Sequence, residues 1–491
     1  MTATLARTPE QDARRRSTVT WVVALATLGL IFDGYDLVVY GAVVSTFLRD
    51  PTQIGEVTPQ LAGLLGSYAL VGVLVGALLA GSIADIVGRR TVMLIAYAWF
   101  SVAMAITALM SSATTFGLMR FITGLGVGAL VATTGAIVSE FAPPGKKNLC
   151  NAITYSGVPL GSLLAALLAI ILLGSIGWRG MFMIGALPLV TLLPLAFFKM
   201  PESPTWLVSR GRLEEARAIA ERTGMPLAEA ATAPTAASGD AAAAREAAGA
   251  SAGGRAGYAG LFGPGNAFPA ILLGFMSVTG LMLVYALNTW LPELMRRAGY
   301  DTKGSLAFLL VLNGGAVIGA LLLSRVADRF GPKPVVASCF LCGAISIALL
   351  TFSLPIGLLL LFVAFVGLGT SGTQTLLFGF VANYFRTNVR GAAVAWCAGF
   401  GRLGGVGGPL LGGILIGAGF ALNSIFFILA GLALFGALLT LLVPVRHTHE
   451  LHRTPIEPSA AVAGQDMAPA GAPDTVTPRA EPDPLSTGRE G

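Results

Sequence analysis

Twelve stretches of this chain are each apolar enough and long enough to cross a lipid bilayer, which takes about 20 residues of helix. They come as six followed by six, with bounds near 19–47, 60–83, 91–111, 115–138, 150–174, 178–199, 268–292, 304–326, 334–354, 356–382, 391–417 and 421–444. In lipid a spanning segment must satisfy its own backbone hydrogen bonds, so apolar spans of this length fold as helices. The sequence therefore predicts an all-α membrane protein with 12 transmembrane helices.

The composition agrees with a membrane protein of many spans and argues against several other classes. Hydrophobic residues fill 55% of the 491 positions and charged residues only 11%, which is far more apolar than a soluble domain. The chain has no phosphate-binding G-x-x-x-x-G-K-[ST] loop, and His447, His449 and His452 all follow the last span. Cys339 and Cys342 form a C-x-x-C pair without a second pair of ligands. We therefore expect no enzyme activity, no catalytic residue, no metal site and no cofactor.

The placement of Lys and Arg predicts how the spans are oriented, because cytoplasmic loops carry an excess of both. With the N-terminus inside, the outer loops hold only Arg49, Arg179, Arg296, Arg297 and Lys303 of the 31 Lys and Arg residues. Most of the others lie on the cytoplasmic side, so both termini are predicted to be cytoplasmic. The formal net charge of +6 then belongs to the face next to the lipid headgroups, and no nucleic-acid partner is needed to explain it.

The spans divide the chain into five segments. Residues 1–18 are an Arg-rich cytoplasmic tail, 19–199 the N-terminal six-helix half, 200–267 a cytoplasmic central loop, 268–445 the C-terminal six-helix half, and 446–491 a cytoplasmic tail. The last tail is rich in Pro and Ala, and we expect it to be disordered. In the central loop, the sequence from Leu213 to Arg217 predicts a short helix on the membrane surface, followed by an Ala/Gly-rich linker.

Two carboxylates lie in the middle of the first span, in the sequence Phe32-Asp33-Gly34-Tyr35-Asp36. A carboxylate in hydrocarbon is costly, so an ionisable residue in a span is a candidate for function. The spacing of Asp33, Asp36 and Tyr40 puts all three on one face of a helix. As an unpaired carboxylate in a dry cavity, Asp36 is the expected proton carrier, with Asp33 in support. The alternative is that one Asp caps a break in the helix and the other faces water.

The two halves of the chain repeat a short loop that follows their second spans. Gly81-Ser82-Ile83-Ala84-Asp85-Ile86-Val87-Gly88-Arg89-Arg90 and Ser324-Arg325-Val326-Ala327-Asp328-Arg329-Phe330-Gly331-Pro332-Lys333 share an Asp and a Gly three residues later. Such a repeat predicts two pseudo-symmetric halves that rock against each other. We expect the loop to latch helix ends of opposite halves by salt bridges when the cytoplasmic side closes. The gating candidates are Asp85, Gly88, Arg89, Arg90, Asp328 and Arg329, with Glu140 at the end of span four beside Arg89 and Arg90.

These motifs resemble the major facilitator superfamily over about residues 18–446. The loop is similar to that superfamily's G-x-x-x-D-R-x-G-R-R motif, except that Ile86 stands where Arg is usual in the first copy. Within the superfamily, the sequence from Asp33 to Leu37 is similar to the aromatic acid:proton symporters, carriers of acids such as hydroxybenzoate, protocatechuate and benzoate, and the sequence from Ala286 to Pro292 is also of their style. The resemblance implies the major facilitator fold, a location in the bacterial inner membrane, and a carrier that works as a monomer.

Charged and aromatic residues in the spans are the candidates for binding a substrate. Arg120 in span four and Arg402 in span eleven are fixed positive charges that can each hold a carboxylate through two hydrogen bonds. Neither they nor the two aspartates have a charged counterpart at the repeat distance, which points to a role outside the shared scaffold. The resemblance implies that spans one, five, seven and eleven line the cavity. The candidate substrate-binding residues are Arg120, Arg402, Tyr35, Tyr40, Asn288, Trp290 and Gln374.

Three functions are compatible with these features. The first is secondary active transport, namely proton-coupled uptake (symport) of a small aromatic carboxylate by alternating access. Its partners are the aromatic acid, protons and the lipid bilayer. The second is transport of another solute, such as a sugar, a polyol or a different organic acid, which would not require Arg120 and Arg402 together. The third is a membrane sensor.

Overall fold

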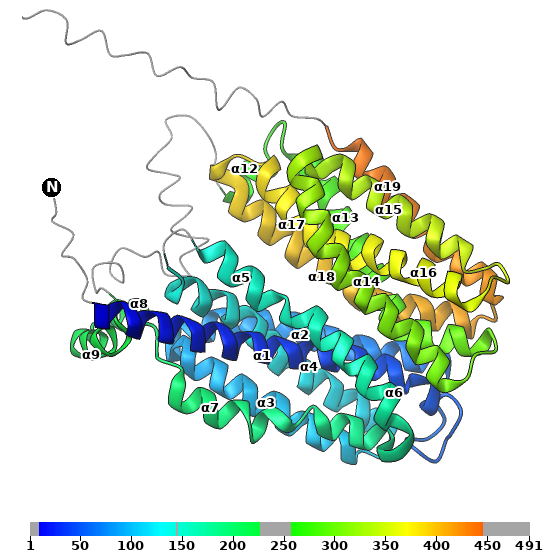
Figure 1. Ribbon diagram of the computed structural model, residues 1–491, viewed down its shortest axis with the longest axis horizontal. Coiled ribbons are helices and arrows are strands. Elements are labelled where there is room, and N and C mark those ends of the chain that lie inside the picture. The colour runs from blue at the N-terminus through cyan, green and yellow to red at the C-terminus, as the bar shows by residue number, and fades with distance from the viewer. Residues whose placement is uncertain (1–8, 144–145, 226–256, 445–491) are drawn as a thin grey trace, which may run out of the picture. The chain divides into compact units, whose positions relative to one another are not determined.

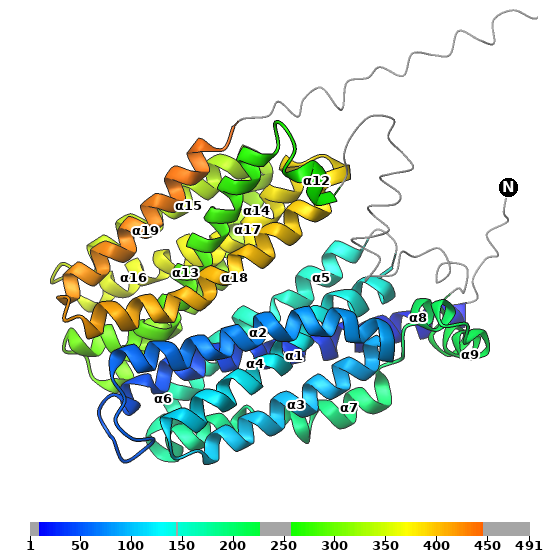
Figure 2. The ribbon, with the colours of Figure 1, turned by 180° about the vertical axis from the view of Figure 1, so that it is seen from behind.

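The computed structural model describes residues 9–143, 146–225 and 257–444, and the described part before Val445 belongs to one compact unit. In this part of the chain every element of regular secondary structure is a helix. Figures 1 and 2 show the helices of the N-terminal half on one side and those of the C-terminal half on the other. The predictions for residues 1–8, for most of the linker and for the tail from 446 concern residues that the structure does not describe.

The N-terminal half begins with four long helices, continues with a short helix that leads into a fifth long one, and ends in two short elements. Their bounds are α1 Pro9–Phe47, α2 Pro59–Val87, α3 Arg89–Leu109, α4 Ala113–Phe141, α5 Lys147–Tyr155, α6 Gly157–Ile184, the 3-10 turn η1 Leu187–Leu189, and α7 Leu192–Lys199. Several starts have the side-chain caps that free backbone N–H groups require: Thr58 accepts from Leu61 N, and Ser112 accepts from Thr115 N.

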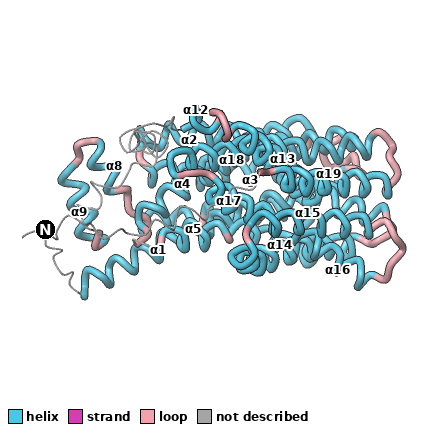
Figure 3. Tube along the Cα trace, turned by 90° about the horizontal axis from the view of Figure 1, so that it is seen from above, coloured by secondary structure: helices cyan, strands magenta, loops and turns pink. Residues whose placement is uncertain are grey.

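The C-terminal half follows the central segment, whose helices are α8 Pro204–Ser209, α9 Leu213–Thr223 and α12 Gly257–Leu261. The half itself consists of α13 Ala267–Arg297, α14 Thr302–Phe330, α15 Pro332–Leu349, α16 Ile356–Gly367, the π-helical turn η2 Leu368–Gly372, α17 Thr373–Tyr384, α18 Thr387–Gly417 and α19 Leu422–Leu442. In Figure 3 the loops gather at the ends of the helices, and α8 and α9 lie at the end where α1 begins. The sequence from Leu213 forms a helix as predicted, namely α9.

The structure corrects two sequence-based boundaries. Helix α1 begins at Pro9, so half of the predicted 1–18 tail is helical; Arg14 and Glu10 form an ion pair on its first turns. Eleven helices in the described residues are long and apolar enough to cross a membrane. The predicted sixth span, 178–199, begins just after a kink in α6, where Gly177 adopts a positive φ of 65°, and it is itself divided where the chain turns before α7. It forms the end of α6, η1 and α7.

Small residues allow the helices of each half to approach closely, as expected where lipid supplies no hydrophobic force between helices. A Cβ atom at Gly161 of α6 would lie 2.6 Å from the carbonyl carbon of Ile31 in α1, and one at Gly34 would meet the backbone of Val158. Since Gly34 stands between the two aspartates of α1, this contact with α6 decides which face of α1 remains for them. Asp33 and Asp36 therefore face away from α6.

The two halves contact each other at the end of the bundle where α1 ends and α2 begins. Helix α2 packs on α18, α1 on α13, and α6 on α14. Ser67 Oγ donates to the Val406 carbonyl at 2.7 Å, and a Cβ at Gly63 would lie 2.6 Å from the Pro409 carbonyl oxygen. At the opposite end, Asp85, Arg89 and Arg90 form their hydrogen bonds and ion pairs within the N-terminal half and the central segment.

The α1–α6 contact can be tested with two glycines of the same helix. Gly161→Ala should destabilise the protein by about 1–3 kcal/mol, because the added methyl group forces the two helices apart. Gly174→Ala is the matched control, since no atom lies within 4 Å of a Cβ there, and it should be neutral or stabilise the helix by up to about 1 kcal/mol. Thermal unfolding of both variants in detergent measures the difference. Equal melting temperatures would show that the helices are not in this close contact.

Candidate functional site

A narrow polar pocket lies between the halves, near the middle of the long helices. It is lined by Asp33, Asp36, Leu37, Tyr40, Gly66, Ala69, Leu70, Val73, Arg120, Val127, Tyr285, Thr289, Arg402 and Pro409. These residues come from α1, α2 and α4 of the first half and from α13 and α18 of the second. The space open to the centres of water-sized molecules is about 30 Å³, enough for a water molecule or two but not for an organic solute. The structure is thus contracted around this pocket.

All four charges that the sequence places inside spans meet in this pocket. The prediction that Asp33, Asp36 and Tyr40 share one face of α1 is confirmed, since each lines it. Arg120 forms an ion pair with Asp36, and both side chains are buried, with 3% and 7% of their surface exposed. The Arg120 guanidinium also lies over the ring of Tyr40, 5.4 Å from its centre. The sequence-based premise that Asp36 is unpaired is therefore wrong, because Arg120 from α4 reaches it.

Asp33 and Arg402 stand on opposite sides of the pocket and are not in direct contact. Among the described residues, neither takes part in an ion pair, although Arg402 is near enough for its charge to act on Asp33. Arg402 and Tyr285 of α13 line the same pocket. The pocket thus holds one closed ion pair within the first half and one open pair of opposite charges across the two halves.

Four of the predicted substrate-binding residues do not reach this pocket. The Tyr35 hydroxyl donates to the Met181 carbonyl at 2.7 Å, and the Trp290 indole donates to the Pro409 carbonyl at 2.8 Å. Asn288 accepts from Asn313 at 3.0 Å, and Gln374 donates to Ser277 Oγ at 3.1 Å. Each is buried inside its own half or in helix packing, because it lies on a different face of its helix from the pocket residues.

Two pocket residues, Tyr285 and Thr289, were absent from the predicted site. They lie four positions apart in α13 and so share a helix face, whereas Asn288 and Trp290 flank that face on either side. Stepping by four from Tyr285 would have found Thr289. Nothing in the sequence of this one helix shows which face turns to the pocket.

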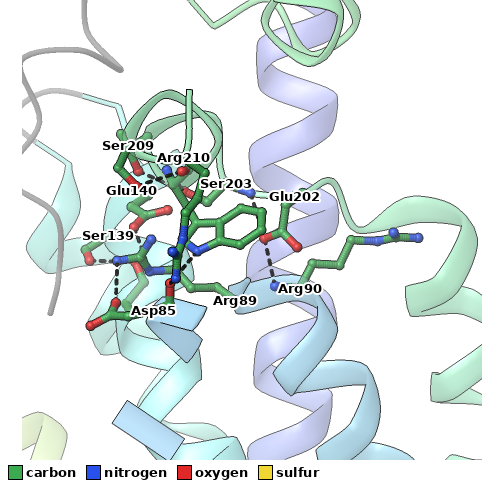
Figure 4. Close-up of polar contacts among 12 residues, drawn as sticks. Asp85, Arg89, Arg90, Ser139, Glu140, Glu202, Ser203, Ser209 and Arg210 are labelled. Carbon is green, nitrogen blue, oxygen red and sulfur yellow. Dashed lines mark hydrogen bonds and ion pairs between the residues drawn. The ribbon is translucent and has the colours of Figure 1, made fainter. Parts of the chain in front are cut away.

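A second polar cluster lies at the far end of the N-terminal half, around the Asp85 loop. Arg89 is fully buried and sits between two carboxylates, Glu140 at 3.0 Å and Asp85 at 3.7 Å (Figure 4). The Glu140 side chain is only 6% exposed, whereas that of Asp85 is 40% exposed. The expected proximity of Glu140 to Arg89 is confirmed, and Glu140 supplies the better-buried partner.

The segment after α7 ties itself to the same loop. The Asp85 carbonyl accepts from the Trp206 indole at 2.8 Å and from Arg210 at 2.6 Å. Glu202 accepts from the backbone N–H of Arg90 at 3.0 Å (Figure 4). The expected latch to the opposite half is not formed among the described residues of this structure: the ion-pair and hydrogen-bond partners of Asp85, Arg89 and Arg90 belong to the N-terminal half or the central segment. Sequence reasoning did not anticipate the roles of Glu202, Trp206 and Arg210.

The second copy of the loop keeps the backbone of the first, but among the described residues its Asp328 and Arg329 do not form the ion pairs of the first copy. Gly88 and Gly331 both adopt a positive φ, 98° and 86°, which favours glycine at each turn. Lys333 donates to the Val443 carbonyl at 2.6 Å, much as Arg90 donates to the Phe197 carbonyl at 2.6 Å. Asp328 and Arg329 are exposed and form no ion pair among the described residues.

Comparison with protein families identifies what the chain resembles as a whole. The profile of the family described as "Sugar (and other) transporter" matches residues 22–442. The solved structure of the inward open conformation of the xylose transporter XylE from E. coli superposes with a TM-score of 0.69 at 20% identity, covering 88% of this chain and 97% of that one. At this identity the likeness shows the fold alone, and it confirms the predicted major facilitator architecture.

Curated relatives cover most of the chain at higher identity. The benzoate transport protein of Acinetobacter baylyi is 34% identical over 400 residues, covering 80% of this chain and 83% of the relative. The gentisate transporter of Corynebacterium glutamicum is 32% identical over 434 residues, covering 87% and 88%. The 4-hydroxybenzoate transporter PcaK of Acinetobacter baylyi is 28% identical over 416 residues, covering 83% and 88%.

The buried Arg89–Glu140 pair can be tested by removing one charge. Glu140→Gln should cost about 3–5 kcal/mol of stability, because it leaves a buried guanidinium with only the distant Asp85 as a partner. Glu215→Gln breaks the exposed Arg212–Glu215 pair of α9 and is the control, expected to cost at most about 1 kcal/mol. Thermal unfolding of the purified protein compares them. If both variants melt alike, the Arg89–Glu140 pair does not stabilise this conformation.

Proposed function

We propose that this chain, which belongs to the family of sugar (and other) transporters within the major facilitator superfamily, carries a small aromatic carboxylate into the cell together with a proton. As a member of that family it is an integral membrane transporter and not an enzyme. The names of the relatives, which transport benzoate, gentisate and 4-hydroxybenzoate, support this class of substrate. The proposed membrane is the bacterial inner membrane, and the proposed working unit is one chain.

The observation that carries the proposal is that Arg402, in the central pocket, forms no ion pair among the described residues. Asp36 forms an ion pair with Arg120, whereas Arg402 lines the pocket together with Asp33 and Tyr285. A guanidinium held between membrane helices is under-compensated in this arrangement, and a substrate carboxylate would supply the missing charge. Tyr40 and Tyr285 offer ring surfaces on either side for an aromatic group. A neutral solute would leave Arg402 as it is.

We assign the transported proton to Asp33 and not to Asp36. Asp36 forms an ion pair with Arg120, while Asp33 has no ion pair among the described residues. A carboxylate that is removed from water and lacks a cation is stabilised by taking up a proton. When the proton leaves, Asp33 competes with the substrate for Arg402, which links substrate release to proton release across the two halves.

We infer which conformation of the transport cycle this structure represents from the contacts between the halves. They touch where α1 ends and α2 begins, and the Asp85 and Asp328 loops are separate from the opposite half. If the Lys- and Arg-rich side is cytoplasmic, this is a conformation that is closed to the outside. In the reverse conformation the outer contacts, such as Ser67 with Val406, would open, and the two loops would approach each other. Asp85, Gly88, Arg89, Arg90, Glu140, Asp328 and Arg329 are the proposed gating residues.

The substrate's charge is tested by competition and by changing Arg402. Benzoate should inhibit uptake of the labelled acid, and benzamide, its neutral analogue, should not. Arg402→Gln should weaken binding about 10- to 100-fold, since a hydrogen bond to a charged group is worth about 1.5–3 kcal/mol. Arg402→Lys should restore only part of the affinity, because an ammonium lacks the planar fork. Equal inhibition by benzoate and benzamide would favour a neutral solute.

The proton assignment is tested by comparing two aspartate variants in proteoliposomes. Asp33→Asn should abolish accumulation against a gradient but keep substrate counterflow, since it removes only the proton site. Asp36→Asn should impair both, because it leaves Arg120 buried without a counter-charge. Uptake with and without a protonophore, and counterflow of labelled substrate, give the two readouts. Protonophore-sensitive accumulation by Asp33→Asn would rule out this assignment.

A further inference from the structure

A second polar pocket lies between the halves, at the end of the bundle opposite the Asp85 loop. It is lined by Ala42, Ser45, Thr46, Arg49, Asp50, Pro292, Arg296, Thr302, Ser305 and Leu306. The residues come from the end of α1, the end of α13 and the beginning of α14, so both halves contribute. Its volume is about 220 Å³. This is below the range of about 300–1,000 Å³ typical of drug-sized ligands, and it suits a smaller molecule.

This outer pocket is separate from the central one. Asp36 and Ser45 are nine residues apart in α1, which at 1.5 Å per residue is about 13 Å along the helix. The two pockets share no lining residue. A solute that occupies one leaves the other free.

Arg296 has hydrogen-bonding capacity that the protein does not use. Its side chain is 12% exposed, and its Nε and one Nη atom are buried without a hydrogen-bond partner. Its carboxylate neighbour, Glu293, lies at 3.5 Å and is bound more closely by Arg297, at 3.0 Å. A guanidinium that is nearly buried and shares its counter-ion in this way favours an additional anion.

Ser45, in the N-terminal half, also has hydrogen-bonding capacity that the described residues do not use. Its residue is 7% exposed, and its hydroxyl has no hydrogen-bond partner among the described residues. Several other buried hydroxyls in the spans bond to the carbonyl four residues earlier, as Thr107 does to Ala103, although Ser101, Thr134 and Thr154 share the unpaired state of Ser45. An unpaired buried hydroxyl is costly, so a ligand that accepts its hydrogen bond gains affinity. Thr302 and Ser305 add hydroxyls at the start of α14, whose N-terminus is already capped by the Asp301 carboxylate.

The one carboxylate that lines the outer pocket is already engaged. Asp50 accepts from the Thr52 hydroxyl at 2.6 Å, from Gln53 Nε2 at 2.6 Å and from the Thr52 backbone at 3.0 Å. These hydrogen bonds lower the pKa of Asp50, so it stays charged at neutral pH and turned toward its own loop. Since Arg49 and Arg296 also line the pocket, positive charge remains in excess there.

We propose that the outer pocket is a second binding site for a small carboxylate, which the transported acid occupies at the outer mouth of the protein. The ligand class and the outward position rest on the proposed function, whereas the anion preference rests on Arg296 and Ser45 alone. Because the site is built from both halves while they touch, an anion bound there stabilises the conformation closed to the outside. The separation of the halves in the outward-open conformation dismantles the site.

The test counts binding sites for labelled benzoate on the full-length protein in lipid nanodiscs. At saturation the unchanged protein should bind two molecules per chain, one in the outer pocket and one in the central pocket, which must widen from about 30 Å³ while the outer contacts persist. Arg296→Gln should bind one, with at least about tenfold weaker affinity at the lost site. Glu293 keeps Arg297 in this variant, so the fold is retained. Arg297→Gln is the matched control: it removes the same charge beside the same carboxylate but does not line the pocket, and it should still bind two.

Two further variants separate this proposal from the proposed function. Ser45→Ala, which removes a hydroxyl that bonds to nothing, should weaken the same site as Arg296→Gln. Arg402→Gln should lose the central site and keep the outer one. If Arg402→Gln still binds two molecules, the central assignment fails and the outer site stands. A single site that is sensitive to Arg402 and insensitive to Arg296, or no benzoate binding at all, overturns the outer site.

Discussion

A charge between membrane helices must be compensated there, and this requirement organises the centre of the protein. The cost of an isolated ion in a water-poor interior is several kcal/mol, far more than a single helix contact supplies. Arg120 and Asp36 meet this cost by pairing within one half. Arg402 and Asp33 face each other across the two halves without closing a pair. One ion pair and two unpaired opposite charges therefore line the same pocket.

Helix packing holds these charges in place with very little side-chain volume. Glycines of α1 and α6 let the two backbones approach, and this contact turns Asp33 and Asp36 away from α6 and toward α4 and α18. Across the halves, Gly63 and Pro409 bring α2 against α18 at one end of the bundle. The outer pocket lies at this same end, so any ligand there senses whether the halves are together. The proposed central and outer sites are thus coupled through one rigid-body movement.

The two halves share a backbone plan but differ in chemistry. The turns at Gly88 and Gly331 have nearly the same dihedral angles, and both loops send a cation to a carbonyl near the end of their half. In the second half, Pro332 occupies the position equivalent to Arg89, and Asn383 the position equivalent to Glu140. The buried ion pair of the first half therefore has no equivalent at these positions. The first half is accordingly closed by ion pairs at this end, while the second has its Asp328 loop exposed. The asymmetry is what a directional device requires of two similar halves.

The sequence by itself determined the spans, the repeat, the four charges within spans and the shared face of Asp33, Asp36 and Tyr40, because hydrophobic length and the helical period are local properties. It also determined the family resemblance, which the comparisons confirm. Only the tertiary structure decided which face of each helix turns to the pocket. Tyr35, Asn288, Trp290 and Gln374 have the right chemistry but lie on other faces, while Thr289 lies on the right one. The partner of Asp36 and the division of the sixth span were likewise decided by packing, since helices that are apolar all round carry no periodic signal to fix their rotation.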